Sequence, residues 1–350
     1  MGRQAQAGVR CRLAGRLRVR RHGSGRGGIE VFLRAEQPAT IESFGDVLLP
    51  EEAQEPILAK PVRSALLEWL TEIWAKDDLA DVGLKARRRS IFHGAPGTGK
   101  TTLAHHLAAR LGLPMLLVRP ERLKSKWIGQ TAMQIGSLFD ALKAQPEPFF
   151  LFFDEFDSLA AQRMDGGQNQ VGEQDHNHGV NTLLANFDRY EGFIVAATNH
   201  GRRVDEAIWR RFEIQIELAL PGDHERRHIL ARYFAPFVLP DDALQVLSVS
   251  METASPALMR SFAEHIKRQI VVGPKAGWTM DRNAVIGRAI ETVKPHPDLG
   301  LPRLWSRGLD DAAVAAFPWP LHRDLAAYPS QREEAAPPVA NVVALKRGGA

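Results

Sequence analysis

The sequence predicts an α/β fold, in which a parallel sheet is flanked by helices on both faces, followed by a small domain made only of helices. Two observations predict this. Between residues 90 and 216, short apolar segments alternate with amphipathic segments of helix length. Strands that are apolar throughout are typical of parallel sheets buried on both faces. After residue 221, apolar residues recur only at helical spacing.

The elements follow from this pattern in chain order. The expected strands are the apolar segments at 90–93, 114–118, 149–153, 193–197 and 212–216. The expected helices between them have apolar residues at helical spacing, at 61–75, 102–111, 121–144 with a break at Gly129, 181–187 and 204–209. Residues 162–179 are polar and rich in glycine, so we expect a loop there. The second part is expected to contain helices at 223–234, 255–272 and 281–293.

The composition is that of a soluble globular protein. Of 350 residues, 44% are hydrophobic and 25% are charged, which fits one to three domains. No apolar run approaches the length of a membrane span, so no span is expected. Cys11 is the one cysteine in the sequence, which excludes an internal disulfide framework. These features favour a cytoplasmic protein.

The net charge of +4 is distributed unevenly. Residues 1–28 contain eight arginines and no acidic residue, so residues 29–350 carry a net charge of −4. A basic head can attract nucleic acid, anionic lipid or an acidic partner. The segment can also be a solvated tail, or the start codon can be assigned too far upstream. We favour these two interpretations over a binding role for the segment.

The segment Gly-Ala-Pro-Gly-Thr-Gly-Lys-Thr at 94–101 fits the pattern G-x-x-x-x-G-K-[ST] and lies between an expected strand and an expected helix. Glycines let the loop turn its backbone N–H groups around a phosphate, and the helix N-terminus behind it favours the same anion. Lys100 can reach the β- and γ-phosphates, and the Thr101 hydroxyl can bind Mg²⁺. The alternative is a glycine-rich turn that binds nothing. The expected nucleotide contacts are Gly94, Ala95, Pro96, Gly97, Thr98, Gly99, Lys100, Thr101 and Thr102.

Two acids follow the apolar strand at 149–153. The carboxyl ends of the strands are the edge at which open parallel sheets bind ligands. Asp154 is therefore expected to bind Mg²⁺, and Glu155 to polarise the attacking water as general base. The alternative is a solvated acidic turn. Asp157 is expected to cap or support the next helix.

Three further residues can complete this site. Asn199 follows the strand at 193–197, where its amide can orient water or contact the γ-phosphate, although asparagine is also a common turn residue. Arg210 and Arg211 are adjacent and precede the last strand. They can be surface charge, or they can project from one subunit towards the γ-phosphate of a neighbour, as an arginine finger does.

These segments make the chain similar to the AAA ATPase family, within the larger AAA+ class. The resemblance covers about residues 43–272 and rests on 94–101, 149–157, Ala-Ala-Thr-Asn at 196–199 and Asp-Glu-Ala-Ile-Trp-Arg-Arg-Phe at 205–212. It implies ATP and Mg²⁺ as cofactors, at the interfaces of a ring that is usually a hexamer. It also implies four family roles: Walker A for Lys100 and Thr101, Walker B for Asp154 and Glu155, sensor 1 for Asn199, and arginine finger for Arg210 and Arg211.

The resemblance also gives a role to Lys126, Trp127, Ile128 and Gly129. They occupy the place of the pore loop with which the family grips an extended polypeptide, and they are most similar to the katanin and spastin branch. The alternative for Trp127 is a residue buried under the loop. Residues 163–179 fall where a second pore loop would be, and we reject a metal site for Asp175, His176 and His178 there.

Two departures from the family pattern stand out. Ala95 replaces the more common proline, which leaves the phosphate cradle intact. Ala257 occupies the place where many AAA+ branches have the sensor 2 arginine, as it does in AAA proper. Arg260 is a possible substitute, although we favour its interpretation as a residue on the helix surface.

The resemblance divides the chain into four parts. We expect an Arg-rich, mostly disordered segment at 1–42, the large α/β subdomain at 43–221, a helical lid at 222–294 and a Pro/Ala-rich extension at 295–350. The predicted function is ATP-driven remodelling, unfolding or disassembly of a protein substrate or adaptor-bound protein through a central pore. The alternatives are a nucleic-acid motor or loader, which the acidic body disfavours, and an ATP-dependent assembly switch. A GTPase is not expected, because no N/T-K-x-D motif follows the strands.

Overall fold

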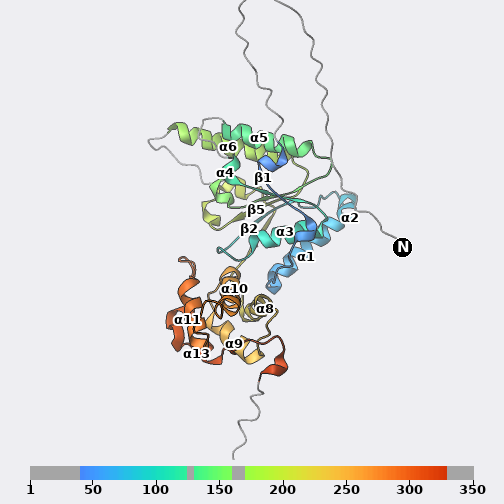
Figure 1. The fold of residues 1–350 in the computed structure, drawn as a ribbon. Coiled ribbons are helices and arrows are strands. Elements are labelled where there is room, and N and C mark those ends of the chain that lie inside the picture. Colours follow the sequence, from blue (N-terminus) through green and yellow to red (C-terminus); the bar gives the residue numbers. More distant parts are fainter. Residues whose placement is uncertain (1–39, 124–129, 160–169, 329–350) are drawn as a thin grey trace, which may run out of the picture. The chain divides into compact units, whose positions relative to one another are not determined.

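Six strands form one sheet in the order β1-β3-β4-β5-β2-β6 (Figure 1). The computed structural model describes residues 40–123, 130–159 and 170–328, and leaves out the side chains of 170–177 and 203. The described residues belong to one compact unit. The strands are β1 (Gly45–Leu48), β2 (Arg89–His93), β3 (Met115–Val118), β4 (Phe150–Phe153), β5 (Ile194–Thr198) and β6 (Ile214–Glu217).

The expected parallel sheet is confirmed for β2 to β6, which are the five strands that the sequence predicts. The sequence does not predict β1, which pairs antiparallel with β3 at the edge. This strand contains only two apolar residues, too few to give a periodic signal. Gly45 is required there, because a Cβ atom would lie 2.1 Å from the carbonyl oxygen of Leu117.

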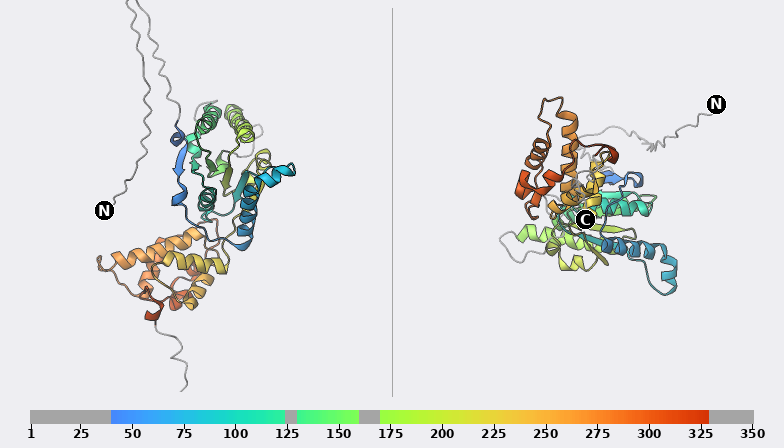
Figure 2. Two further views of the ribbon diagram at one scale, coloured as in Figure 1. Left: turned by 90° about the vertical axis from the view of Figure 1, so that its right-hand side faces the viewer. Right: turned by 90° about the horizontal axis from the view of Figure 1, so that it is seen from below.

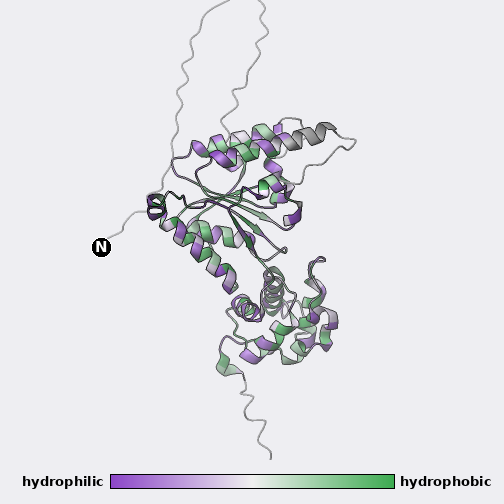
Figure 3. Ribbon diagram, turned by 180° about the vertical axis from the view of Figure 1, so that it is seen from behind, coloured by the Kyte–Doolittle hydropathy of each residue, from purple (hydrophilic) through white to green (hydrophobic). Residues whose placement is uncertain are grey.

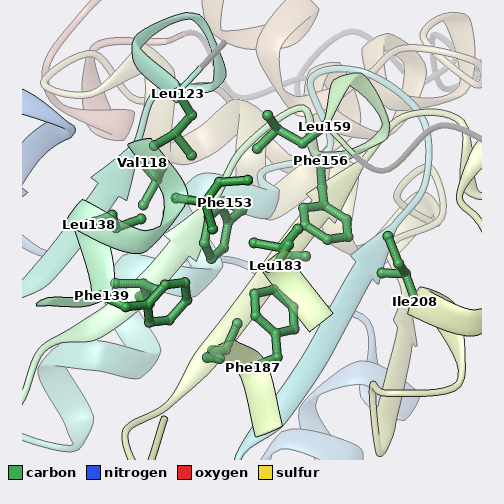
Figure 4. Packing of buried hydrophobic residues seen from close by; sticks show 14 of the residues in the cluster. Val118, Leu123, Leu138, Phe139, Phe153, Phe156, Leu159, Leu183, Phe187 and Ile208 are labelled. Carbon is green, nitrogen blue, oxygen red and sulfur yellow. The ribbon is translucent and has the colours of Figure 1, made fainter. Parts of the chain in front are cut away.

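Helices cover both faces of the sheet, as expected (Figure 1). On one face, α5 (Gln130–Lys143) and α6 (Gln170–Arg189) pack on the side chains of Leu151 and Phe153 (Figure 4). On the other face, α1 (Lys60–Trp74) and α3 (Lys100–Arg110) pack on Phe150 and Phe152. Successive side chains of β4 thus enter different cores, which is why this strand is apolar at every position.

Three short helices lie in the connections. They are α2 (Lys76–Asp81), which the sequence does not predict, α4 (Pro120–Leu123) and α7 (Glu206–Trp209). The break expected at Gly129 lies outside the described residues.

The expectation of a loop over 162–179 is wrong for its last part, because α6 begins at Gln170 and continues to Arg189. The buried half of this helix includes Val180, Leu183 and Phe187, which pack in the core. Once those turns are fixed by packing, each further residue adds a backbone hydrogen bond without a new nucleation cost. A polar extension of this kind has no apolar periodicity by which to recognise it.

The second part of the chain is helical throughout (Figure 2). Ser255 caps α10 as expected, since its hydroxyl accepts the N–H of Leu258 at 3.3 Å. The sequence does not predict α9. The helices are α8 (Asp223–Phe234), α9 (Asp241–Ser250), α10 (Pro256–Val272), α11 (Arg282–Thr292), α12 (Arg303–Arg307) and α13 (Ala312–Ala316). Apolar residues of these helices pack together in one core, and both apolar and polar residues occur along the helices (Figure 3).

The apolar core of the helical part continues beyond residue 294, since it includes Leu304, Val314 and Phe317. The four-part division of the chain stays a prediction. Among the described residues, no helix combines the length and apolar character needed to cross a membrane.

Candidate active site

The loop between β2 and α3 has the backbone expected of a phosphate cradle. Gly94, Gly97 and Gly99 have φ angles of 145°, 74° and 95°, in the region that side chains rarely adopt. At Gly94 a side chain is excluded by contact as well, since a Cβ would lie 2.2 Å from the carbonyl oxygen of Leu218. Gly99 caps α3, whose first turn leaves backbone N–H groups facing the loop.

Lys100 is buried beneath this loop, with 7% of its surface exposed. Its Nζ donates to the carbonyl oxygens of Gly94 at 3.0 Å and Ala95 at 2.9 Å. Burial lowers the pKa of Lys100 below its ordinary value, against the opposing attraction of Asp154 and Asp157. Because its direct partners are neutral carbonyls, the ammonium charge remains available to a bound anion.

Thr101 and Asp154 lie together although 53 positions separate them in the chain. The Thr101 hydroxyl donates to Oδ2 of Asp154 at 2.9 Å, and Oδ1 of Asp154 accepts the N–H of Glu155 at 3.0 Å. A hydroxyl and a carboxylate side by side at the end of a phosphate loop are the oxygen ligands that Mg²⁺ prefers. The side chains present therefore fit a phosphate-bound Mg²⁺.

Glu155 has φ 47° and ψ 43°, and it is the only non-glycine residue with a positive φ in the part of the chain that the structure describes. The conformation places it at the start of a 3₁₀ turn (Phe156–Ser158), with its side chain exposed. A left-handed glutamate is strained, and strain of this kind concentrates at functional sites.

Asn199 directly follows β5, the strand between β4 and β2. The sheet therefore brings the acids after β4, the amide after β5 and the loop after β2 to one edge. The neighbouring Thr198 hydroxyl donates to Asp157 at 2.8 Å, which ties the ends of β5 and β4 together. Asp157 thus supports the strand ends, rather than only the following turn.

The structure does not bring Arg210 and Arg211 into this group. Both precede β6, which runs parallel to β2, so they lie towards the opposite edge of the sheet from the phosphate loop. Arg210 pairs with Glu206 one turn earlier, and Arg211 pairs with Asp188 near the end of α6. In the isolated chain these arginines are held by its own carboxylates.

The expected pore loop, Lys126 to Gly129, lies outside the described residues, as do residues 160–169. The side chains of Asp175 and His176 are also outside the description, and His178 is exposed on α6. The role of these segments stays a prediction.

Sequence reasoning missed a small apolar cavity beside the phosphate loop. Its volume is about 180 Å³, and Thr98 of the loop forms part of its wall. The chain around the start of α1, the segment from the end of β6 into α8, and the start of α10 form the rest, so three segments far apart in sequence meet there. Its walls include Ile57, Leu58, Val62, Leu218, Leu220 and Pro256.

The start of α10 also contacts the loop directly. The N–H of Ala257 donates to the carbonyl oxygen of Gly97 at 3.2 Å, and a Cβ on Gly97 would lie 2.8 Å from the Ala257 Cβ. Arg260, the possible substitute for the missing arginine, instead bonds Glu264 at 2.7 Å and lies over the ring of Tyr233. These contacts favour the helix-surface interpretation of Arg260.

One further pattern in α8 fits a metal site by spacing alone. His224, Glu225 and His228 match H-E-x-x-H, and the two imidazole rings lie 4.3 Å apart. Within the described residues, no third histidine, cysteine or acid gathers with them in the way that a zinc site requires. We therefore assign no metal to α8.

Comparisons with known proteins show which family this part of the chain resembles. Residues 90–220 match the model described as "ATPase family associated with various cellular activities (AAA)". A protein named as an uncharacterized AAA family ATPase from Sinorhizobium fredii is 40% identical over 180 residues, which are 50% of this chain and 52% of that protein. The proteasome-activating nucleotidase of Pyrococcus abyssi is 32% identical over 189 residues, which are 52% and 47% of the two chains.

A solved structure supports the fold. The crystal structure of the FIGL-1 AAA domain in complex with ADP is similar with a TM-score of 0.56 and 21% identity, over 73% of this chain and 88% of that one. The chain spans about half the length of the curated relatives named above. Residues 90–220 are therefore similar to the AAA ATPase family, and the fold matches that of a P-loop AAA domain followed by a helical part. The comparisons do not single out the katanin and spastin branch, so that assignment stays a prediction.

Proposed function

We propose that this protein hydrolyses ATP in an oligomeric ring and uses the energy to remodel a protein substrate. The observation that carries the proposal is the edge of the sheet where Lys100, Thr101, Asp154, Glu155 and Asn199 gather. Each residue type there matches one requirement of phosphoanhydride hydrolysis, and the order of the strands brings them together from three separate segments.

The roles follow from the positions. The loop N–H groups and the Lys100 ammonium bind the phosphates, and Thr101 with Asp154 would hold Mg²⁺. When bound, Mg²⁺ neutralises charge on the phosphate oxygens. Glu155 accepts the proton of the attacking water, and the Asn199 amide orients that water. Glu155 is exposed at the start of the 3₁₀ turn, where water can reach its carboxylate.

The apolar cavity beside Thr98 suits a flat heterocyclic base, which would be the part of the ligand that lies away from the phosphates. It adjoins the loop, and carbon-rich side chains dominate its walls. A nucleotide whose phosphates lie in the loop would extend its base towards this cavity. We therefore assign the adenine of ATP to it.

The separation of the two arginines from the phosphate loop supports a ring. They cannot serve the site of their own subunit from the opposite edge of the sheet. A second copy that presents its phosphate loop to Arg210 and Arg211 would complete the site, and an arginine supplied in this way contributes on the order of 10³-fold or more in rate.

The protein substrate is inferred from Lys126, Trp127, Ile128 and Gly129. A large flat side chain on a loop can pack on a polypeptide without reading its sequence. The match to a relative named as a proteasome-activating nucleotidase is consistent with a polypeptide as substrate.

The test is the substitution Glu155→Gln, which keeps the size of the side chain and removes its basicity. We expect ATP binding to persist and hydrolysis to fall on the order of 10²-fold or more. Phosphate release measures hydrolysis, titration with a fluorescent ATP analogue measures binding, and size-exclusion chromatography with ATP measures assembly. The matched control is Glu147→Gln, an exposed glutamate in the turn before β4, which should behave as the unmodified protein. Hydrolysis at the normal rate by Glu155→Gln would overturn the assignment of the general base.

A further inference from the structure

Asp188, near the end of α6, binds two arginines at once. Its Oδ2 accepts from Arg211, and its Oδ1 lies 3.5 Å from Nη1 of Arg89. Because each carboxylate oxygen has its own guanidinium partner, rotation of the Asp188 carboxylate is limited. The exposed fractions are 45% for Arg211, 41% for Asp188 and 21% for Arg89, so Arg89 is the half-buried partner and Arg211 the more accessible one.

The backbone beneath this ion pair is fixed by buried rings. Phe187 precedes Asp188 and Phe212 follows Arg211, and their rings pack edge to face with centroids 5.9 Å apart. Both are almost fully buried, and Phe187 lies in the core beside Phe153 and Phe156 (Figure 4). Packing therefore brings Asp188 and Arg211 together and limits how far either backbone can move.

A second set of contacts ties Arg211 to the strand that carries the phosphate loop. The Glu213 carboxylate accepts the backbone N–H of Arg88 at 2.9 Å and that of Arg89 at 3.3 Å. Arg89 opens β2, which is hydrogen-bonded to β5 on one side and to β6 on the other. The segment that contains Arg211 is thus hydrogen-bonded to the start of β2, and the phosphate loop begins at the other end of β2.

We propose that Asp188 is a positioning residue for Arg211. Asp188 binds Nη1 of Arg211, and the remaining donors of the guanidinium stay available for a phosphate of the nucleotide bound by a neighbouring copy. The inference rests on the proposed function and selects Arg211 rather than Arg210 as the acting arginine. Among the described residues, Arg210 pairs with Glu206 of α7 alone, and the side chain of Arg210 is 74% exposed.

The experiment is a double-mutant cycle in steady-state ATP hydrolysis by the full chain. Arg211→Ala removes the finger, and Asp188→Asn removes the charge that orients it with almost no change in size. Misplacement of a catalytic group by about 1 Å can cost on the order of 10²-fold. We expect Asp188→Asn to lower kcat about tenfold with the KM for ATP unchanged, because Asp188 does not touch the nucleotide of its own subunit.

Three further variants separate positioning from a structural role. The double variant Asp188→Asn/Arg211→Ala should be no slower than Arg211→Ala, since the orienting charge then has nothing to orient. Asp188→Glu should recover part of kcat. Asp140→Asn, which breaks another exposed ion pair on α5, with Lys143, should keep the normal rate.

The outcomes are distinct. Normal turnover by Asp188→Asn, or a double variant slower than Arg211→Ala, overturns the positioning role. A slow Asp188→Asn whose urea midpoint falls in parallel indicates a structural role and also overturns it. Absence of turnover in the unmodified protein instead refutes the proposed function.

Discussion

At the scale of single residues, the site combines favourable contacts with one unfavourable conformation. Thr101 and Asp154 satisfy each other at 2.9 Å, and Lys100 has two carbonyl partners. Among the non-glycine residues that the structure describes, Glu155 alone adopts a left-handed backbone, which costs a residue with a Cβ atom about 1 kcal/mol. A glutamate retained in such a position is explained more readily by its chemistry than by its contribution to stability.

The energetic cost of the left-handed backbone at residue 155 can be measured with two substitutions. Asparagine tolerates the left-handed region better than other non-glycine residues, whereas glutamine keeps the strain. The free energy of unfolding should therefore be higher for Glu155→Asn than for Glu155→Gln, by up to about 1 kcal/mol. Both variants should lose hydrolysis, because neither side chain is a base. Urea denaturation gives the stability difference. Equal stability of the two variants would show that the strain is negligible.

At the scale of elements, the buried parallel strands were easier to predict than the edge strand β1 and the start of α6. β2 to β5 are buried at nearly all positions, so their apolar runs are unmistakable. β1 is a half-polar edge strand that exists because β3 offers it hydrogen-bonding groups. The start of α6 is a polar continuation of a packed helix. In both cases the tertiary partner, and not local propensity, decides the structure.

A polar contact at Asp311 joins the start of α13 to α9 and α12 in the helical part. Asp311 is buried, accepts the Ser250 hydroxyl at 2.6 Å and lies 3.1 Å from Nε of Arg303. Replacing Asp311 by alanine leaves the buried Ser250 hydroxyl and the half-buried Arg303 without this acceptor. We expect a loss of about 2 kcal/mol in the free energy of unfolding. Urea denaturation measures it, with Asp310→Ala, its exposed neighbour, as the control.

The same contact makes stability depend on pH. Burial alone would raise the pKa of Asp311, but hydrogen bonds from Ser250 and the Ala313 N–H, with the charge of Arg303, outweigh it and hold the pKa below its usual range. The contribution is therefore complete above the pKa of the unfolded chain and is lost as the pH falls through the lowered folded value. The destabilisation by Asp311→Ala should shrink in acid. A penalty independent of pH down to that range would contradict this account.

At the scale of the whole molecule, the residues proposed for ATP hydrolysis lie towards opposite edges of one sheet. The phosphate loop, the acids and the amide occupy one edge, and Arg211 with Asp188 lies towards the other. Both edges are connected through the same aromatic core, because Phe156 follows Glu155 and packs on Phe212 with centroids 5.6 Å apart. This arrangement favours copies that complete one another's sites.

Substrate handling should be separable from hydrolysis at this scale. Trp127→Ala should spare basal ATP hydrolysis and abolish both the stimulation of hydrolysis by an unfolded model protein and its processing, because the grip on the polypeptide is lost. Trp74→Ala is the matched control, since Trp74 is 56% exposed on α1 and should have no such effect. Unchanged processing by Trp127→Ala would exclude the pore-loop role.

The sequence by itself determined the α/β class, five strands, the phosphate loop and the candidates Asp154, Glu155 and Asn199. Each of these has a local signature: an apolar run, a glycine spacing, or a polar residue at a strand end. Only the tertiary structure decided that Asp188 pairs with Arg211, that Asp157 supports Thr198, and that an apolar cavity adjoins Thr98. These features depend on segments distant in the chain, whose meeting is set by strand order and core packing, and no short stretch of sequence records them.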